Sequence, residues 1–528
     1  MIHLRIGDIL AHNARRAPDA AALIEGERVI GWRDLDLATN RLANALASHG
    51  FGKGKRVATI VRNGAAAVEW IFALAKGGVL AVPINYGLTP NEIGVLFGDS
   101  RPDAIVVDAE FLPALEDVLT RAGVPVIVRG EAAPRAGWLS ERALLAHASE
   151  AAPEARVEPD DIRTIRYTSG TTAAPKGCLG THRQILSSID NFLRQIPVPE
   201  RGAFLQMLPL FSGAGIWMAV AAAYHGVANV LMPEFNPRAA LEAIAKHGVV
   251  HTCGVPTMLS RMTEELQKST QRDGQNRDYV LDSLRLFGYT GSKMPPATIA
   301  RALQTFSCDF YQGFGGGEMG GLVSYLMPQD HRAALGEDAS ATRLASVGRP
   351  AGYAEIRIRD LKTGAPLPAN APGEITVRSA SNFSGYLNRP DDTARTLRGE
   401  WVHTGDVGYL DEDGYLFAVD RAKDMVVTGG MNVSSAEVEA VLAEHPAVKS
   451  AAVIGLPSEE WGEAVTAIVV LREAGAATQA ELMQFARARL AGYKSPKAVH
   501  FVSEFPLNSV GKVLKRELRD QFANQSNI

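Results

Sequence analysis

The 528-residue sequence predicts an α/β protein with a large N-terminal domain, whose mixed and parallel sheets are sandwiched by helices, and a small α+β C-terminal domain. Two observations lead to this prediction. In the first half of the chain, β-rich runs alternate with helical patterns, as is typical of βαβ units. Past residue 430, short strands and helices follow one another on the scale of a separate domain of roughly 100 residues.

Three segments show the alternation most clearly. RVATIV, AVEWIFALAKGG and VLAVPI lie within residues 56–84, and similar strand–helix–strand patterns cover residues 104–128 and 227–252. Shorter strands separated by turns follow, such as YAEIRIRD (353–360) and GEITVRS (373–379). These predict a β-rich subdomain added to the large domain.

The C-terminal part has the pattern of a unit of its own. SSAEVEAVLAEH (434–445) is a predicted helix, with Ser434 and Glu437 at the spacing of a capping box. VKSAAVIG, VTAIVVL and VHFV are predicted strands, and ELMQFARARL is a second helix. We expect a large domain over residues 1–420 and a small one over 424–528, with the boundary inside DRAKDM.

Composition excludes several functional classes. Lys and Arg total 54 against 58 for Asp and Glu, so the net charge of -4 does not favour nucleic acid or anionic membrane. The most apolar window, residues 216–232, is short for a membrane span and predicts a buried helix followed by a strand.

The N-terminus has no apolar signal region, and the three cysteines lack metal-ligand spacing, so we expect a cytoplasmic protein. The assembly state stays open, a homodimer included.

A glycine run, YQGFGGGEMGG (311–321), contains the spacing G-x-G-x-x-G. In a dinucleotide-binding domain this spacing follows a strand and opens a long helix. Here only GLVSYL remains before Met327 and Pro328, which is too short for such a helix. The run therefore predicts a different chemistry.

The stretch YTSGTTAAPKG (167–177) places four hydroxyl side chains around Gly170, with Lys176 behind them. Small residues let backbone N–H groups face an anion, while hydroxyls and an ammonium group neutralise it. The order Lys-Gly-Cys does not match a Walker loop. The stretch indicates a polyphosphate cradle, and a surface turn rich in Ser, Thr and Gly is the alternative.

This stretch resembles the signature of the adenylate-forming superfamily, which includes acyl-CoA synthetases, adenylation domains and beetle luciferases. Five further segments resemble its other motifs in the right order, so the similarity extends over essentially the whole chain. They are LPLFSGAG (208–215), YQGFGGGE (311–318), WVHTGDVGYLDEDGY (401–415), DRAKDMVVTGGMNVSSAEVE (420–439) and NSVGKVLKREL (508–518).

The resemblance implies a two-step reaction. A carboxylate attacks the α-phosphate of ATP, bound with Mg²⁺, to give an acyl-adenylate and pyrophosphate, and the acyl group then passes to a thiol. Because two anions meet in the first step, cations must neutralise them. Lys512 matches the bridging lysine, and an ammonium group ~4 Å from one anion gains about 4 kcal/mol at an effective dielectric near 20. Glu318 matches the Mg²⁺-binding acid, and Thr171 is the third predicted catalytic residue.

A larger set is assigned to ATP by the same resemblance. Asp406 matches the carboxylate that accepts both ribose hydroxyls, Arg421 also reaches the nucleotide, and Phe314 offers a face for adenine. The predicted ATP-binding residues are Thr168, Ser169, Gly170, Thr171, Thr172, Lys176, Gly291, Ser292, Lys293, Gln312, Gly313, Phe314, Gly315, Asp406 and Arg421.

The resemblance also implies a moving C-terminal domain. Lys423 matches the hinge between the two domains, where a rotation would replace Lys512 with a second face for thiolation. On that face Gly429 and Gly430 would leave room for the pantetheine arm of coenzyme A. The small domain is therefore expected to be mobile about Lys423.

Candidate acyl-pocket residues are mostly small or apolar. They are Ser212, Gly215, Ile216, Trp217, Tyr289, Gly316 and Gly317. The family usually carries Thr at position 317 and His at position 212, so both departures remove bulk near the carboxylate of the acid. With no second cation among these residues, a monocarboxylic acid with an apolar body is favoured, either aromatic or short, medium or branched aliphatic.

The predicted function is thus an ATP-dependent carboxylic acid:CoA ligase that uses ATP, Mg²⁺ and coenzyme A. A standalone adenylation enzyme that loads a carrier protein is the alternative within the family. A pseudoenzyme that binds nucleotide or acid without turnover is the alternative outside it, because Gly317 and Ser212 depart from the family pattern.

Overall fold

The structure of the protein is a computed structural model. It describes residues 5–131, 135–168, 175–272, 279–291, 294, 296–334, 343–421, 424–428, 431–458, 461–507 and 513–523. The chain divides into two compact units. The first comprises the described residues up to 355 together with 377–402, and the second comprises 356–376 and the described residues from 403 onward. The predicted boundary and the hinge at Lys423 stay predictions, because Lys423 lies outside the described residues.

The first unit contains a nine-stranded mixed sheet. Its strands, in spatial order, are β16 (Arg349–Pro350), β15 (Gly321–Leu326), β14 (Asp309–Gly316), β13 (Leu286–Thr290), β12 (Val249–Gly254), β10 (Ala203–Gln206), β11 (Ala228–Leu231), β1 (Ala21–Glu25) and β2 (Arg28–Gly31). The central strands from β14 to β1 are parallel, and the outer pairs are antiparallel.

The first unit also contains an eight-stranded sheet. Its order is β19 (Gly385–Tyr386), β9 (Lys176–Thr181), β8 (Ile162–Thr168), β4 (Leu80–Pro83), β3 (Arg56–Ile60), β5 (Ala104–Asp108), β6 (Val126–Arg129) and β7 (Leu139–Ser140). The β8–β9 pair and the β9–β19 pair are antiparallel, and the other pairs are parallel.

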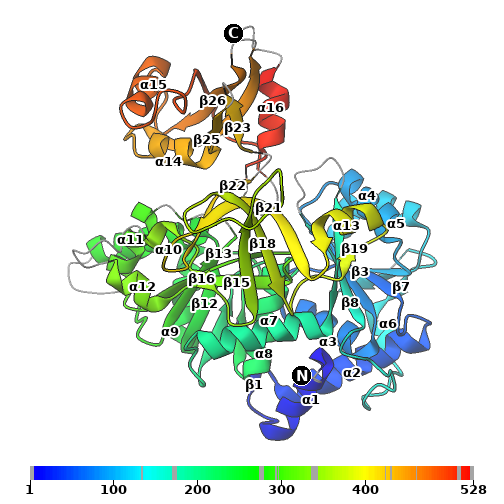
Figure 1. Ribbon diagram of the computed structural model, residues 1–528. Coiled ribbons are helices and arrows are strands. Elements are labelled where there is room, and N and C mark those ends of the chain that lie inside the picture. Colours follow the sequence, from blue (N-terminus) through cyan, green and yellow to red (C-terminus); the bar gives the residue numbers. More distant parts are fainter. Residues whose placement is uncertain are drawn as a thin grey trace. The chain divides into compact units, whose positions relative to one another are not determined.

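Helices cover both faces of these sheets (Figure 1). They are α1 (Ile6–Arg16), α2 (Trp32–Ser48), α3 (Ala65–Gly77), α4 (Pro90–Ser100), α5 (Leu112–Ala122), α6 (Glu141–Leu145), α7 (His182–Gln195), α8 (Gly213–His225), α9 (Pro237–His247), α10 (Pro256–Arg272), α11 (Pro296–Thr305), α12 (Pro328–Ala333) and α13 (Pro390–Thr396). The largest hydrophobic core combines buried side chains of α3, α7 and α8. Because α8 is apolar on nearly every side, it is buried within this core.

The structure confirms the predicted strand–helix–strand units. In the first, β3, α3 and β4 form a parallel pair with its crossover helix, and β5, α5 and β6 repeat the pattern. In the third, β11 and β12 are both parallel to β10, which lies between them. The glycine run is also as predicted, because β14 turns back into the antiparallel strand β15 and no crossover helix follows.

Two further sheets cover the β-rich region and the C-terminal region. One contains β17 (Ala354–Arg359), β18 (Gly373–Ser379), β21 (Trp401–Leu410) and β20 (Leu397–Arg398), with β22 (Leu416–Arg421) paired to β21. The other contains β24 (Met431–Val433), β23 (Val426–Thr428), β26 (Gly462–Leu471) and β25 (Val448–Ser458), with β27 (Ala498–Phe501) paired to β26. Three helices accompany the second of these sheets, α14 (Ser435–Ala443), α15 (Gln479–Arg487) and α16 (Lys515–Ala523).

The predicted capping box at α14 forms only in part. Ser434 is the N-cap, and its hydroxyl accepts a hydrogen bond from the backbone N–H of Glu437 at 3.3 Å. The carboxylate of Glu437 instead receives two hydrogen bonds from Nζ of Lys494, at 2.7 and 2.8 Å. A full positive charge outcompetes a backbone N–H group for this carboxylate.

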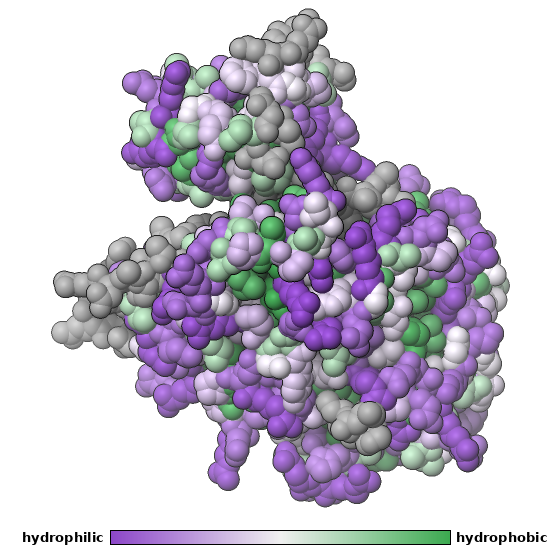
Figure 2. Space-filling view, viewed as in Figure 1, coloured by the Kyte–Doolittle hydropathy of each residue, from purple (hydrophilic) through white to green (hydrophobic). Residues whose placement is uncertain are grey.

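Within the described ranges, no helix combines the length and the apolar character that a membrane span requires. Hydrophilic side chains dominate the face shown in Figure 2. The exposed large hydrophobic side chains, such as Val29 and Leu361, come from many different segments of the chain. Single apolar side chains of this kind are normal on a protein surface.

Candidate functional site

The predicted phosphate loop closes the antiparallel hairpin of β8 and β9. Thr168 and Lys176 form the last paired position of this hairpin, so the loop leaves the sheet at Thr168 and re-enters it at Lys176. Nζ of Lys176 lies 3.3 Å from Oδ2 of Asp392 and 5.2 Å from the ring centre of Tyr386. The ammonium group is thereby held at one end of the loop.

Glu318 lies in the turn between β14 and β15. Gly316 and Gly321 are the last paired residues before this turn, and the N–H of Gly320 donates to the carbonyl of Gly317 at 3.2 Å. A Cβ atom on Gly315 would lie 1.9 Å from the carbonyl oxygen of Gly321. The close approach of the two strands therefore requires glycine at position 315, whatever its part in nucleotide binding.

Tyr386 joins Lys176 to Glu318. Strand β19 pairs with β9, with Tyr386 opposite Cys178, and the hydroxyl of Tyr386 donates to Oε1 of Glu318 at 2.8 Å. Burial and the charge of Glu318 raise the pKa of Tyr386 above its usual value, so the phenol stays protonated at neutral pH. One aromatic ring thus contacts the predicted phosphate-binding cation on its face and the predicted metal-binding acid at its hydroxyl.

The predicted adenine residues meet on two neighbouring strands. Gln312 and Gly313 on β14 lie opposite Tyr289 and Thr290 on β13, and Gly291 follows with a left-handed φ of 90°. The hydroxyl of Thr290 donates to the carbonyl of Gly313 at 2.7 Å, which fixes the end of β13 against β14. Phe314 and Gly315 continue β14 from this point and are both partly exposed.

In the second unit, Asp406 on β21 and Arg421 on β22 are opposite each other across an antiparallel pair. The N–H of Asp406 donates to the hydroxyl of Thr404 at 3.0 Å, and the residue is partly exposed. The sheet therefore brings together the two residues assigned to the ribose side of ATP. The predicted residues outside the described part of the chain are Ser169, Gly170, Thr171, Thr172, Ser292, Lys293, Lys423, Gly429, Gly430 and Lys512.

Two predicted acyl-pocket residues begin helix α8, and each has a structural role there. Ser212 is the N-cap: its hydroxyl accepts from the N–H of Gly215 at 3.0 Å and donates to the carbonyl of Pro209 at 2.7 Å. A Cβ atom on Gly215 would lie 2.0 Å from that same carbonyl oxygen. Helix capping thus explains why a small hydroxyl residue suits position 212.

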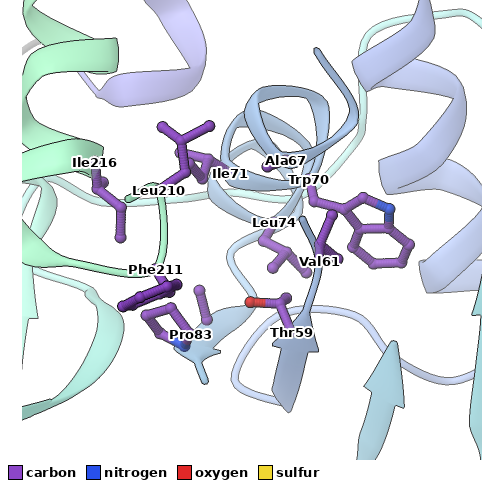
Figure 3. A pocket seen from close by; sticks show the side chains of 11 residues that line it. Thr59, Val61, Ala67, Trp70, Ile71, Leu74, Pro83, Leu210, Phe211 and Ile216 are labelled. Carbon is purple, nitrogen blue, oxygen red and sulfur yellow. The ribbon is translucent and has the colours of Figure 1, made fainter. Parts of the chain in front are cut away.

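The remaining acyl-pocket candidates lie in different surroundings. Ile216 lines a cavity of about 30 Å³ together with Trp70 and Phe211 (Figure 3). Trp217 donates its indole N–H to the hydroxyl of Ser188 at 3.1 Å.

Tyr289 is fully buried, and its hydroxyl lies 2.8 Å from Nε2 of His331. Gly316 and Gly317 flank the turn that carries Glu318 and are partly exposed.

The cavity beside Ile216, of about 30 Å³, has room for one or two water molecules. It is far too small for a substrate acid, since ligand pockets are typically ~300 Å³ or more.

Two residues of this site are absent from the sequence predictions. Tyr386 is one, and Arg166 on β8 is the other, with its Nη2 atom 3.5 Å from the carbonyl oxygen of Gly317. Across the described ranges, no group of three or more His, Cys, Asp or Glu side chains is arranged to hold a metal ion.

Family models match both parts of the chain. The model described as AMP-binding enzyme covers residues 10–387, and the model of its C-terminal domain covers residues 437–512. The chain belongs to the AMP-binding enzyme family. It is an AMP-forming enzyme of the acid–thiol ligase class, and the predicted α/β fold with a smaller C-terminal domain is confirmed.

Relatives of this AMP-binding enzyme carry names for different acids and acceptors. A 2-succinylbenzoate–CoA ligase of Geobacillus kaustophilus is 33% identical over 97% of this chain and 96% of its own length. A fatty acid–[acyl-carrier-protein] ligase of Streptomyces coeruleorubidus is 32% identical over 97% and 96%. The solved o-succinylbenzoate CoA synthetase of Bacillus subtilis, in complex with an acyl-adenylate intermediate, is 28% identical, with a TM-score of 0.86 over 98% and 99%.

Proposed function

We propose that this AMP-binding enzyme is an ATP-dependent carboxylic acid:CoA ligase. It activates the acid as an acyl-adenylate with release of pyrophosphate and then forms a thioester with coenzyme A. The observation that carries the proposal is the contact of Lys176 and Glu318 with the same side chain, Tyr386. A cation at the end of a phosphate loop and an acid beside it suit a nucleotide that binds together with a metal ion. The cation would neutralise the phosphates, and the acid would bind the metal ion.

The residues of the first unit support a division of roles. Lys176 would neutralise phosphate, and Gly291 with residues 312–315 would form the adenine wall. Glu318 would hold Mg²⁺ through its carboxylate, whose Oε1 atom the hydroxyl of Tyr386 already orients. One carboxylate with phosphate and water oxygens is a set of hard ligands that suits Mg²⁺, which would draw charge from the phosphates when bound.

The other assignments of the proposal follow the family motifs. Asp406 and Arg421 would hold the ribose side of the nucleotide, and Thr171 with its neighbours would hold the phosphates. Lys512 would bridge carboxylate and α-phosphate in the first step. Lys423 would act as the hinge, and the glycine pair 429–430 would admit the pantetheine arm of coenzyme A.

For the substrate we propose an acid with one reacting carboxylate and a largely apolar body, either aromatic or short, medium or branched aliphatic. The proposal is supported by the apolar residues of α8 and by the absence of side chains at the partly exposed Gly316 and Gly317 beside Glu318. A carrier protein is the second candidate acceptor, because one relative is named for that acceptor.

A panel of acids tests this function. Purified protein is incubated with ATP, Mg²⁺ and each acid, with coenzyme A, with a phosphopantetheinylated carrier protein, or with neither, and released pyrophosphate and thioester are measured. We expect pyrophosphate release with a subset of acids and thioester on coenzyme A. Thioester on the carrier protein alone would replace coenzyme A as the acceptor. Silence across the panel, with intact ATP binding, would indicate a pseudoenzyme.

A further inference from the structure

Arg166 occupies an unusual position between three segments that are distant in sequence. It lies on β8, with Nη2 3.5 Å from the carbonyl oxygen of Gly317 in the Glu318 turn. Its Nη1 atom is so close to Gly213, the first residue of α8, that a Cβ atom there would lie 2.2 Å away. The guanidinium group therefore fills the space beside Gly213 and reaches the turn that carries Glu318.

The charge of this guanidinium group is poorly balanced. Among the described residues, Arg166 forms no ion pair with a carboxylate, and its buried Nε atom has no hydrogen-bond partner. By contrast, Arg129, also little exposed, pairs with both Asp108 and Glu141. Burial lowers the pKa of Arg166, and the more distant charge of Glu318 opposes that effect.

The helix beside Arg166 adds to the imbalance. The N-terminus of α8 carries the positive end of the helix dipole, which disfavours a cation and attracts an anion. An unpaired charge held out of water is costly, whereas the planar fork of an arginine binds a carboxylate or phosphate with two parallel hydrogen bonds. Since Arg166 is partly exposed, an anion can reach it.

We propose that Arg166 binds an oxyanion of a substrate, either the carboxylate of the acid or a phosphate oxygen of ATP, between Gly213 and the Glu318 turn. This role rests on the proposed ligase function. Arg166 would supply a further cation beside this turn, so that two anions can approach each other there. It would also explain why residue 213 carries no side chain.

Three variants test the proposal. Arg166→Met removes the charge and keeps the length, Arg166→Lys keeps the charge without the fork, and Gly213→Ala displaces the guanidinium group. Arg163→Met is the matched control, because Arg163 is another arginine on β8, is buried, and has an Nε atom that also lacks a partner. The readouts are the Tm without ligand, the rise in Tm with ATP, with pyrophosphate and with the acid, and the KM of each substrate.

We expect Arg166→Met to have an unliganded Tm equal to or above that of the wild type, because a charge that has little access to water and no carboxylate partner is removed. Its binding of one substrate should weaken by about 10- to 100-fold, the range of a charge-assisted hydrogen bond. Weaker ATP and pyrophosphate binding identifies a phosphate oxygen as the ligand, and a raised KM for the acid alone identifies the carboxylate. Arg166→Lys and Gly213→Ala should weaken the binding of the same substrate by smaller factors. The control, Arg163→Met, should leave the binding of all substrates unchanged.

A lower unliganded Tm for Arg166→Met, with wild-type ligand responses, would overturn the proposal and assign Arg166 a structural role. If Arg166→Met does not fold, wild-type KM values in both Arg166→Lys and Gly213→Ala would overturn it equally. The two proposals fail separately. A wild type that forms no adenylate from any acid contradicts the ligase function, while the responses of Tm to ATP and pyrophosphate still test Arg166.

Discussion

Replacement of Tyr386 by Phe tests the contact on which the proposed ATP site depends. The change removes one oxygen atom and keeps the ring that lies 5.2 Å from Nζ of Lys176. The lost interaction is the hydrogen bond to Oε1 of Glu318 at 2.8 Å. Because the acceptor is a carboxylate, the bond is expected to contribute about 1.5–3 kcal/mol.

The lower end of that range applies, because Glu318 is partly exposed and water can replace the phenol. About 1.5 kcal/mol corresponds to a loss of roughly 10-fold, since 1.4 kcal/mol is tenfold in an equilibrium constant. We expect the Kd of ATP, measured by calorimetry at several Mg²⁺ concentrations, to rise by about this factor, with half-saturation shifted to higher Mg²⁺.

Tyr353→Phe is the matched control. The hydroxyl of Tyr353 also donates to a carboxylate, Asp190, at 3.1 Å, but the residue is 44% exposed. We expect its removal to leave ATP binding within twofold of the wild type. An unchanged Mg²⁺ dependence in Tyr386→Phe, or equal effects in the two variants, would refute the assignment of Glu318 as the metal-binding acid oriented by Tyr386.

Three further predictions concern stability and mechanism. Gly315→Ala should lower the free energy of unfolding in urea by about 3 kcal/mol, because its Cβ would meet backbone. Gly98→Ala, at an exposed position of helix α4, should raise it by about 0.5–1 kcal/mol. Equal effects of the two substitutions would contradict the packing at β14. Burial lowers the pKa of three histidines, to about 3 for His182 and His251 and to about 4 for His331. As the pH falls, the imidazoles of the unfolded chain take up protons before those of the folded protein. The free energy of unfolding should therefore fall between about pH 6.5 and 4, by about 1.4 kcal/mol per pH unit for each histidine. A flat Tm over this range would argue against neutral buried imidazoles. Lys512→Ala should abolish adenylate formation and preserve thioester formation from a supplied acyl-adenylate in a stopped assay, and equal loss of both steps would exclude the assigned role.

Much of the fold could be predicted from the sequence because its signals are local. The runs that became β3, α3 and β4 carry their periodicity within about 30 residues, so strand and helix types were evident. The same is true of the β14–β15 hairpin, where GLVSYL left no room for a helix. Glu437 shows the limit, because its partner Lys494 is 57 positions away and no local pattern could reveal it.

The site was predictable only where a motif is continuous in the chain. Lys176 and Glu318 were selected by their motifs, and their roles stay predictions. Tyr386 was missed because its link to them depends on the pairing of β19 with β9. Arg166 was missed because, in the sequence, it is one arginine in a strand. Its proximity to Gly213 and Gly317, which suggests a role for it, is visible only in the structure.

Ser212 shows a different limit of the sequence. Its departure from the family pattern suggested a role in substrate shape, but the hydroxyl caps α8. A capping role and a pocket role can both be met by a small residue such as serine at position 212, so the sequence alone could not separate them. Ser212→Ala should lower Tm more than it changes the preference among acids if capping dominates, and the reverse result would restore the pocket role.

The most direct test of the central claim is product analysis by mass spectrometry for an acid that supports pyrophosphate release. The account predicts that the acyl-adenylate accumulates with ATP and Mg²⁺ alone, and that added coenzyme A converts it to the thioester with equimolar AMP. Formation of ADP and phosphate, or a thioester formed without any adenylate, would contradict it.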